Sequence, residues 1–271
     1  MFRKEPENIR QYMTSIEKFL KTSSKYLLNY LGSELIEVEK GERDFALRAD
    51  IELENAYKCY LSEQYPDIPI LGEELSPEIV AKDFKGQFWA IDPIDGTVNY
   101  SRGLPEYGTS IALIMHGKPI AAGLCFPSLN ETYIAGAGEG AFLNGTRISV
   151  SNSNRLNSSI LVFGDFSVKE NHLVDNIVRF NYIKRFADEV LRVRMPGSAA
   201  LQLAWVASGR ADISLTLSNN AWDVQGGVLL VREAGGCVYD FDGSDHTIAS
   251  KYTIASNTII KNLIIQFISH I

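Results

Sequence analysis

Residues 89–99 constrain this chain more than any other stretch, because they join an apolar run to two carboxylates at a turn. The run at 88–91, Phe-Trp-Ala-Ile, is typical of a buried strand. Pro93 has no N–H for a sheet ladder and restricts the residue before it, so we expect the strand to end at Asp92. Asp92 and Asp95 then lie at the strand end, where they either form an ordinary Asx turn or converge on a hard cation.

Size and charge limit the kinds of partner that the protein can have. A chain of 271 residues is long enough for a large core. Its 26 basic and 33 acidic residues give a net charge of −7, which argues against a nucleic-acid partner. An acidic protein that handles an anionic substrate needs local positive charge, and metal ions can supply it.

The cysteines and the apolar runs indicate a cytoplasmic protein. Cys59, Cys125 and Cys237 are isolated, and we expect all three to be buried and reduced. The first residues lack a signal-peptide pattern. No apolar run approaches the roughly 20 residues of a membrane span, so we expect no membrane partner.

Hydrophobic periodicity in about residues 1–155 predicts helices followed by antiparallel strands. We expect helices at 6–31 and 50–64, a hairpin or loop at 34–49, and a short strand at 70–71. The apolar runs at 110–116 and 120–126 flank a turn and predict a hairpin. Strands at 131–137 and 140–144 extend this meander, and Asn144-Gly145 is a turn dipeptide.

From about residue 156 to residue 271 the pattern changes to alternating strands and helices. Strands are expected around Val162 and at 192–194, 211–217 and 252–255. Helices are expected at 169–180, 198–208 and 223–234. This alternation predicts a second sheet covered by helices, in an α/β fold. Without a linker between the halves, residues 1–271 are expected to form a single domain.

Other polar stretches have both an ordinary and a functional interpretation. Glu73 and Glu74 follow a short strand, and either they are simply exposed or Glu73 binds a metal while Glu74 organises water. Asp223 and Asp50 each precede a helical pattern and can act as helix N-caps. Ser198 can cap the next helix in the same way, or leave free N–H groups there for an anion.

Together these stretches resemble the inositol monophosphatase family. The resemblance rests on WAIDPIDGTVNY at 89–100, GEE at 72–74 and WDVQGGVLLVREAGG at 222–236. GEGAFLNGTRISVS at 138–151 and PGSAA at 196–200 also match, so the similarity runs from about residue 10 to 257. It implies an αβαβα sandwich, a homodimer, and Mg²⁺-dependent, often lithium-sensitive hydrolysis of small phosphomonoesters.

The resemblance also implies a set of metal ligands. A first metal would take Glu73, Asp92 and the Ile94 carbonyl, and a second would take Asp92, Asp95 and Asp223. Asp92 would therefore bridge the two ions. The family pattern implies two or three Mg²⁺ ions, with Mn²⁺ as a substitute and Li⁺ as an inhibitor.

Further residues follow from the same resemblance as catalytic or substrate-binding groups. The Thr97 hydroxyl, paired with Asp50, and the Glu74 carboxylate would activate a metal-bound water that attacks phosphorus directly. The substrate would contact seven residues: Asp95, Gly96, Thr97, Gly197, Ser198, Ala199 and Thr216. No histidine is implied, and the four in the sequence lie outside the motifs.

Two departures from the family pattern bear on the substrate. Inositol-specific members have a glutamate where this chain has Thr216, and Lys40 lies one residue nearer to the following aspartate than expected. Inositol 1-phosphate is the first expected substrate, with histidinol phosphate and fructose 1,6-bisphosphate as alternatives. A different class of protein, an inactive binder of metal or sugar phosphate, is also consistent with the motifs.

Overall fold

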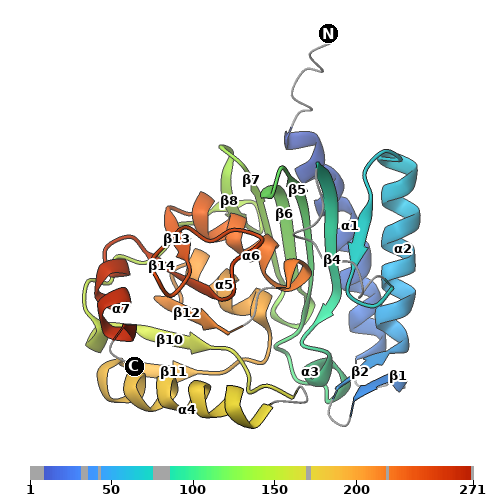
Figure 1. The fold of residues 1–271 in the computed structure, drawn as a ribbon. Helices are drawn as coiled ribbons and strands as arrows, with labels where there is room; N and C mark the ends of the chain where they lie inside the picture. Colours follow the sequence, from blue (N-terminus) through green and yellow to red (C-terminus); the bar gives the residue numbers. More distant parts are fainter. Residues whose placement is uncertain are drawn as a thin grey trace.

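Helices and sheets alternate in five layers in the computed structural model, which describes residues 9–31, 36–41, 44–75, 86–168, 172–217 and 220–269 (Figure 1). Helices α1 (Ile9–Tyr30) and α2 (Arg48–Gln64) cover the outer face of a seven-stranded sheet. Helices α5 (Ala199–Ala207) and α6 (Ala221–Glu233) separate it from a five-stranded sheet. Helices α4 (His172–Glu189) and α7 (Lys261–Ile268) lie beyond that second sheet. The predicted αβαβα sandwich is confirmed.

The seven-stranded sheet contains the predicted meander. Its strands, in spatial order, are β3 (Ile70–Gly72), β4 (Gln87–Asp95), β5 (Gly108–Met115), β6 (Lys118–Phe126), β7 (Glu131–Gly136), β8 (Gly140–Leu143) and β9 (Thr146–Arg147). Strand β3 runs parallel to β4, and the remaining pairs are antiparallel. Asn144 and Gly145 both have positive φ between β8 and β9, which is the turn that their sequence predicts.

The five-stranded sheet is mixed. Its order is β11 (Arg192–Arg194), β10 (Ile160–Phe163), β12 (Ile213–Thr216), β14 (Thr253–Asn257) and β13 (Gly236–Tyr239). The first three strands are parallel, and β14 is antiparallel to both of its neighbours. The sequence predicted a second sheet here but not the directions of its strands. Strand β13 and helix α7 have no counterpart in the sequence expectations.

The core is built around the two middle helices. Helix α1 has a conventional apolar stripe, which buries Tyr12, Ile16 and Leu20 against the first sheet. Helices α5 and α6, in contrast, are buried almost all round because they have a sheet on either side. The largest apolar cluster therefore contains residues of both sheets, such as Leu124 of β6 and Val162 of β10.

Several expected boundaries are wrong. Strand β4 continues past Pro93 to Asp95, since an irregularity in its pairing with β5 accommodates a residue without an N–H. Helix α4 extends beyond the expected end at residue 180, because Phe186 still packs into a second apolar cluster. This cluster lies between the five-stranded sheet and helices α4 and α7. The expected starts of the first and fourth helices, 6–8 and 169–171, lie outside the described residues.

The hairpin alternative for residues 34–49 is correct over its described part, where β1 (Ile36–Gly41) pairs with β2 (Asp44–Leu47). All three cysteines are free, as expected. Only Cys125 is buried, since Cys59 on α2 is exposed and Cys237 on β13 is half-buried. No described helix is long and apolar enough to span a lipid bilayer.

Candidate active site

Three carboxylates from distant parts of the chain meet at one end of the first sheet. Glu73 follows β3, Asp92 lies near the end of β4, and Asp223 lies in the first turn of α6. One oxygen from each of the three lies within 4.8 Å of the others. An all-oxygen ligand set of this kind suits a hard divalent cation such as Mg²⁺.

Asp92 is the buried member of this acidic cluster, with 3% of its surface exposed. Its Oδ1 accepts a hydrogen bond of 3.0 Å from the Ile94 N–H, so the expected Asx-type turn is present together with the cluster. Burial raises the pKa of Asp92, and the charges of Glu73, Asp95 and Asp223 raise it further. A bound cation would relieve this repulsion, and the site therefore fits a metal.

The loop that carries Glu73 and Glu74 is held by Glu54 of α2, a residue that the sequence interpretation did not identify. The fully buried Glu54 carboxylate accepts hydrogen bonds from the N–H groups of Glu74 (2.8 Å) and Leu75 (3.1 Å). A side chain at Gly72 would place its Cβ 2.0 Å from Glu54 Oε1. The glycine at position 72 was therefore the sequence feature that could have indicated the close approach of the Glu54 side chain to this loop.

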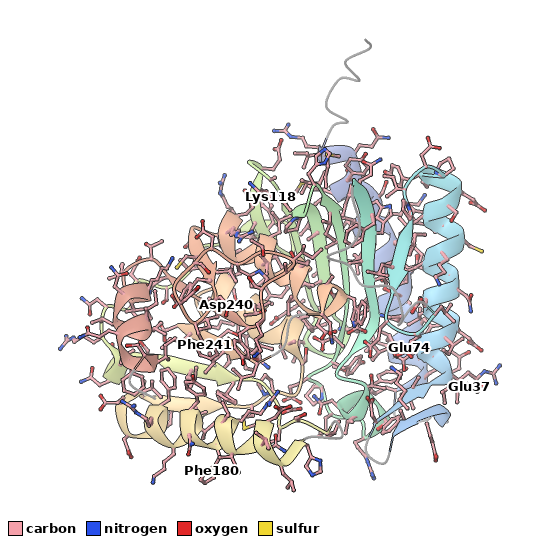
Figure 2. The ribbon with its side chains drawn as sticks, viewed as in Figure 1. Glu37, Glu74, Lys118, Phe180, Asp240 and Phe241 are labelled. Atoms are coloured by element: carbon pink, nitrogen blue, oxygen red, sulfur yellow. The ribbon has the colours of Figure 1, made fainter. Side chains whose placement is uncertain are left out.

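Lys40 of β1 lies against the same loop, and Glu74 is labelled there in Figure 2. The Lys40 ammonium is 3.1 Å from Glu73 Oε1 and 2.7 Å from Glu74 Oε1. Burial alone would lower the pKa of Lys40, but the two carboxylates outweigh it and raise this pKa. The shifted spacing of Lys40 in the sequence therefore does not keep its charge away from the acidic loop.

Asp95 directs its carboxylate at the start of α5. It accepts hydrogen bonds from the Ser198 hydroxyl (2.6 Å) and from the N–H groups of Ala200 (2.6 Å) and Ala199 (3.2 Å). Burial raises the pKa of Asp95 to about 6, although these hydrogen bonds oppose the shift. The Ala199 N–H, expected to contact substrate, thus donates to Asp95 here. Metal binding by Asp95 stays a prediction.

Ser198 is the N-cap of α5, as one interpretation of the sequence expected, and its hydroxyl accepts from the Leu201 N–H. Gly197 before it has φ +74°. The Asn99 amide donates to the carbonyls of Pro196 (2.8 Å) and Glu106 (2.7 Å). The PGSAA stretch is therefore fastened directly to the central motif.

The N-cap expected at Asp50 is wrong, because α2 begins two residues earlier, at Arg48. Asp50 instead lies in the first helical turn, where its Oδ2 accepts from the Leu47 N–H at 2.8 Å. Its other oxygen, Oδ1, is buried without a hydrogen-bond partner. Burial raises the pKa of Asp50.

The N-cap expected at Asp223 is also wrong. Helix α6 begins at Ala221 with Asn220 as its N-cap, so Asp223 lies in the first turn and accepts from the Asn220 side-chain amide at 3.0 Å. The hydroxyl of Ser110 on β5 donates to the Trp222 carbonyl at 2.9 Å. This bond fixes the start of α6, and hence Asp223, against the first sheet.

The predicted Thr97–Asp50 hydrogen bond is not formed. The Thr97 hydroxyl, at the start of the short helix α3 (Thr97–Ser101), donates to the Ile94 carbonyl at 3.0 Å. Gly96 has φ +90°, and a Cβ there would lie 2.9 Å from the Glu106 carbonyl oxygen. Phosphate binding by the N–H groups of Gly96 and Thr97 stays a prediction.

Thr216, on β12, is 4% exposed, and its hydroxyl donates to Gln202 Oε1 at 3.1 Å. Its contact with substrate stays a prediction. None of the described histidines (His116, His172 and His246) belongs to the acidic cluster, and His270 lies outside the described residues.

The five-layered αβαβα fold and the acidic cluster at a sheet end together define an α/β protein whose oxygen ligands suit a hard divalent cation. Comparison with known proteins then gives the family. The model of the inositol monophosphatase family matches residues 10–271. The chain belongs to this family, whose members are phosphoric monoester hydrolases.

Two relatives and one solved structure illustrate the similarity. The fructose-1,6-bisphosphatase/inositol-1-monophosphatase of Thermotoga maritima is 33% identical over 258 residues, which is 95% of each chain. The Nus factor SuhB of Xylella fastidiosa is 40% identical over 211 residues, covering 77% of this chain and 73% of the relative. The structure of a Thermotoga maritima IMPase has a TM-score of 0.84 at 32% identity, covering 96% of this chain and 97% of that one.

Proposed function

We propose that the protein is a Mg²⁺-dependent phosphomonoesterase whose first substrate is inositol 1-phosphate. The observation that carries this proposal is the convergence of Glu73, Asp92 and Asp223 within 4.8 Å. Asp92 is buried and repelled by its acidic neighbours, as expected of a residue that bridges two cations.

The proposed ligands are those that the family resemblance implies. Glu73, Asp92 and the Ile94 carbonyl would hold one ion, and Asp92, Asp95 and Asp223 the other. When bound, the ions would polarise the phosphoryl group and lower the pKa of a nucleophilic water. Two such ions, with a third as an option, match the family pattern, and Mn²⁺ substitution and Li⁺ inhibition are proposed with them.

The chain itself would position the reacting groups. Asp50 Oδ1 is a buried acceptor without a partner, whereas the Thr97 hydroxyl donates to the Ile94 carbonyl. The proposed pairing therefore requires the Thr97 hydroxyl to change its acceptor to Asp50. The pair would then hold the proton of the attacking water. Burial raises the pKa of Glu74, which suits a second proton acceptor.

The choice of substrate rests on the protein's departure from the inositol-specific pattern. Thr216 offers one small hydroxyl, which already donates to Gln202. A relative named for both fructose-1,6-bisphosphatase and inositol-1-monophosphatase activity supports broad selectivity. We propose that inositol 1-phosphate is preferred by no more than about tenfold, or about 1.4 kcal/mol in transition-state binding. Histidinol phosphate and fructose 1,6-bisphosphate remain the alternative substrates.

The test is phosphate release from these three compounds and glycerol 2-phosphate, with and without Mg²⁺. Mg²⁺-dependent release supports the proposal, whereas tight binding of substrates without release would identify an inactive sugar-phosphate binder. Thr216→Glu should shift kcat/KM toward inositol 1-phosphate, because it supplies a charged acceptor for the polyol. Thr216→Gln, of equal size but neutral, is the matched control.

We also propose that the protein is a homodimer. Helix α4 exposes apolar side chains at helical spacing: Leu173 (71%), Val174 (68%), Ile177 (63%), Val178 (44%) and Phe180 (59%). Phe180 lies on the outer side of α4, away from the sheets (Figure 2). A contiguous apolar face of this kind usually marks an interface. Cytoplasmic location, and the lack of nucleic-acid or membrane partners, stay predictions from composition.

A further inference from the structure

The two aspartates of the central motif are three residues apart, yet both serve the same side of the seven-stranded sheet. In a regular strand side chains alternate between the two faces, so residues three apart point to opposite faces. Asp92 lies in the acidic cluster with Asp223 of α6, and Asp95 accepts hydrogen bonds from the start of α5. Helices α5 and α6 cover the same face. Strand β4 must therefore depart from regular geometry between the two aspartates.

The pairing of β4 with β5 shows this departure. Asp92 lies opposite Ser110 of β5. Three residues further along β4, Asp95 lies opposite Gly108, which is only two residues away from Ser110. One extra residue in one strand of an antiparallel pair is a β-bulge. Ser110 faces α6, because its hydroxyl donates to the Trp222 carbonyl, and the bulge brings both aspartates onto this face.

The bulge takes backbone polar groups out of regular pairing, and side chains bind them. Pro93 has no N–H, and the Ile94 N–H donates to Asp92 Oδ1 at 3.0 Å. The Pro93 carbonyl accepts a hydrogen bond of 2.8 Å from the hydroxyl of Thr109. Thr109 is the single residue of β5 between the partners of the two aspartates. Since buried carbonyl groups are nearly always paired, this hydroxyl stabilises the bulge.

The Thr109 side chain is enclosed by the outer helices. It is 1% exposed and lies on the same face as Ile111, which packs in the apolar cluster beneath α1 and α2. Tyr57 of α2 is fully buried beside it, with its hydroxyl 3.4 Å from the Ser23 hydroxyl of α1. Burial raises the pKa of Tyr57, and hydrogen bonds with Ser23 and Thr109 oppose this rise. The Thr109 hydroxyl therefore connects the bulge with both helices.

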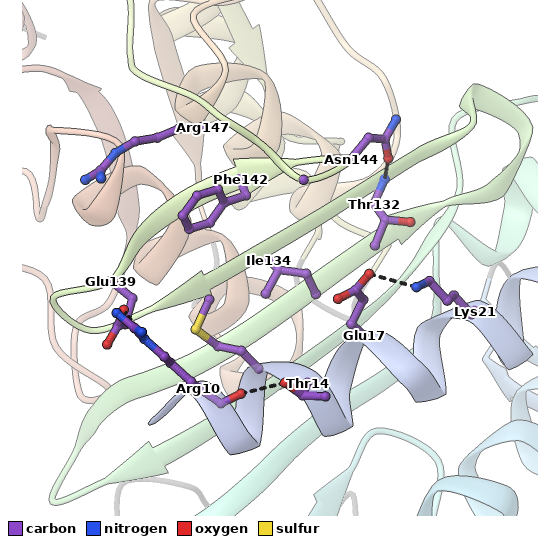
Figure 3. A pocket seen from close by; sticks show the side chains of 12 residues that line it. Arg10, Thr14, Glu17, Lys21, Thr132, Ile134, Glu139, Phe142, Asn144 and Arg147 are labelled. Atoms are coloured by element: carbon purple, nitrogen blue, oxygen red, sulfur yellow. Dashed lines mark hydrogen bonds and ion pairs between the residues drawn. The ribbon is translucent and has the colours of Figure 1, made fainter. Parts of the chain in front are cut away.

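A large cavity on the same face of the sheet does not reach this hydroxyl. The cavity lies between α1 and strands β7 to β9, toward the other edge of the sheet, and has a volume of about 740 Å³ (Figure 3). Met13, Ile134 and Phe142 are among the residues that line it, whereas Thr109 and Tyr57 are not. Water in this cavity therefore cannot replace the Thr109 hydroxyl at the bulge.

We propose that Thr109 is a positioning residue for the metal site, because its hydroxyl holds the bulge at Pro93. The bulge in turn keeps the carboxylates of Asp92 and Asp95 on one face. This inference rests on the proposed function, in which the two carboxylates bind Mg²⁺. Mg²⁺ demands nearly ideal octahedral geometry, so a small change in the relative position of two ligands weakens its binding.

The substitution Thr109→Val tests this role, since it removes the hydroxyl and preserves the shape of the side chain. We expect Mg²⁺ affinity, measured by calorimetric titration, to fall about tenfold, as for other residues that act through metal ligands. Thr109→Ser keeps the hydroxyl and should bind Mg²⁺ almost as tightly as wild type. The matched control is Thr253→Val on β14, which removes another fully buried hydroxyl, 3.1 Å from His246 Nε2. It should leave Mg²⁺ affinity unchanged.

Urea unfolding of each variant ensures that the affinities of folded proteins are compared. Should Thr109→Val not fold, Thr109→Ala removes the same hydroxyl with less bulk and is judged by the same criterion. Equal Mg²⁺ affinity in the Thr109 and Thr253 variants would overturn the inference, and so would a Thr109→Ser variant as weak as Thr109→Val. Wild-type protein that binds no Mg²⁺ would instead overturn the proposed function, and the inference with it.

Discussion

At the scale of single residues, Asp92 is the buried carboxylate of the acidic cluster in the candidate site. Its carboxylate is buried, caps its own turn through the Ile94 N–H, and lies next to Glu73 and Asp223. Without a cation, this arrangement lowers stability, because burial and like charges both oppose ionisation. The same position should therefore control both stability and metal binding.

Asp92→Asn should separate these two effects. Removing the buried charge should raise the melting temperature of the metal-free protein by about 3 °C, roughly 1 kcal/mol. The stabilisation by Mg²⁺ should be lost, and phosphatase activity should fall more than about 100-fold, since even outer partners of metal ligands contribute about 10–100-fold. Thermal unfolding with and without Mg²⁺ measures this, and Asp67→Asn, at an exposed site, is the control. An unchanged Mg²⁺ shift in Asp92→Asn would contradict the bridging role.

His246 gives a pH dependence with a defined sign. Burial, aided by the charge of Arg232, lowers the pKa of His246 from 6.5 to about 4. Between these values the unfolded chain binds a proton and the folded chain does not, so this residue makes stability fall as pH drops from 6.5 to 4. The full effect is about 3 kcal/mol.

His246→Gln should remove this contribution. The difference in unfolding free energy between wild type and variant should shrink by about 3 kcal/mol between pH 7.5 and pH 4. Urea unfolding of both proteins across this range measures it. Because Asp92 and Asp95 titrate in both proteins, the comparison cancels their effect. Parallel pH profiles would mean that His246 has the same pKa in the folded and unfolded states.

At the scale of elements, the end of β3 shows how a strand and a helix together place a ligand. Gly72 ends β3, and the Glu54 carboxylate of α2 occupies the space where a side chain would lie. That carboxylate then holds the N–H groups of Glu74 and Leu75. The position of Glu73 in the acidic cluster thus depends on the contact between β3 and α2.

Gly72→Ala should displace this loop, because its Cβ would lie 2.0 Å from Glu54 Oε1. We expect a loss of about 1–3 kcal/mol in stability and about tenfold in Mg²⁺ affinity. Gly164→Ala is the matched control, since a Cβ there meets its nearest atom at 3.5 Å and the φ of Gly164 is not positive. Mg²⁺ titrations of both variants measure the effect. Equal Mg²⁺ affinities would show that Gly72 does not position the loop that carries Glu73.

At the scale of the whole molecule, α4 leaves an apolar face that the described chain does not cover. One face of α4 exposes Leu173, Ile177 and Phe180 together. Phe186 of the same helix is buried instead, in the apolar cluster against the five-stranded sheet. Two copies of the molecule would cover these faces in a twofold arrangement. The exposed apolar face of α4 is therefore the feature of the single chain that supports the proposed dimer.

Ile177→Glu should weaken dimerisation by at least about 2 kcal/mol, or about thirtyfold, because it places a charge in an apolar interface. Sedimentation equilibrium over a range of concentrations measures this. Leu28→Glu changes an equally conspicuous apolar residue, 49% exposed, on α1 and is the control. A wild-type protein that sediments as a monomer at all concentrations would overturn the proposal.

The sequence by itself determined the local features and the class of site. The turn at Asn144-Gly145, the hairpin around residue 117 and the Ser198 cap all follow from short-range chemistry. Because such features depend on neighbouring residues alone, a pattern of a few positions predicts them. The family resemblance added the five layers, which periodicity only outlines.

Only the tertiary structure decided which of several possible partners each polar group takes. Asp95 caps α5 more than 100 residues away, Lys40 of the β1–β2 hairpin reaches Glu73 in the loop after β3, and Glu54 of α2 holds that loop. A carboxylate in a sequence has the same capacity for a metal, an N–H group or an ammonium ion. Which of these it meets depends on the packing of layers, and so does the contact between the Thr109 hydroxyl and the Pro93 carbonyl.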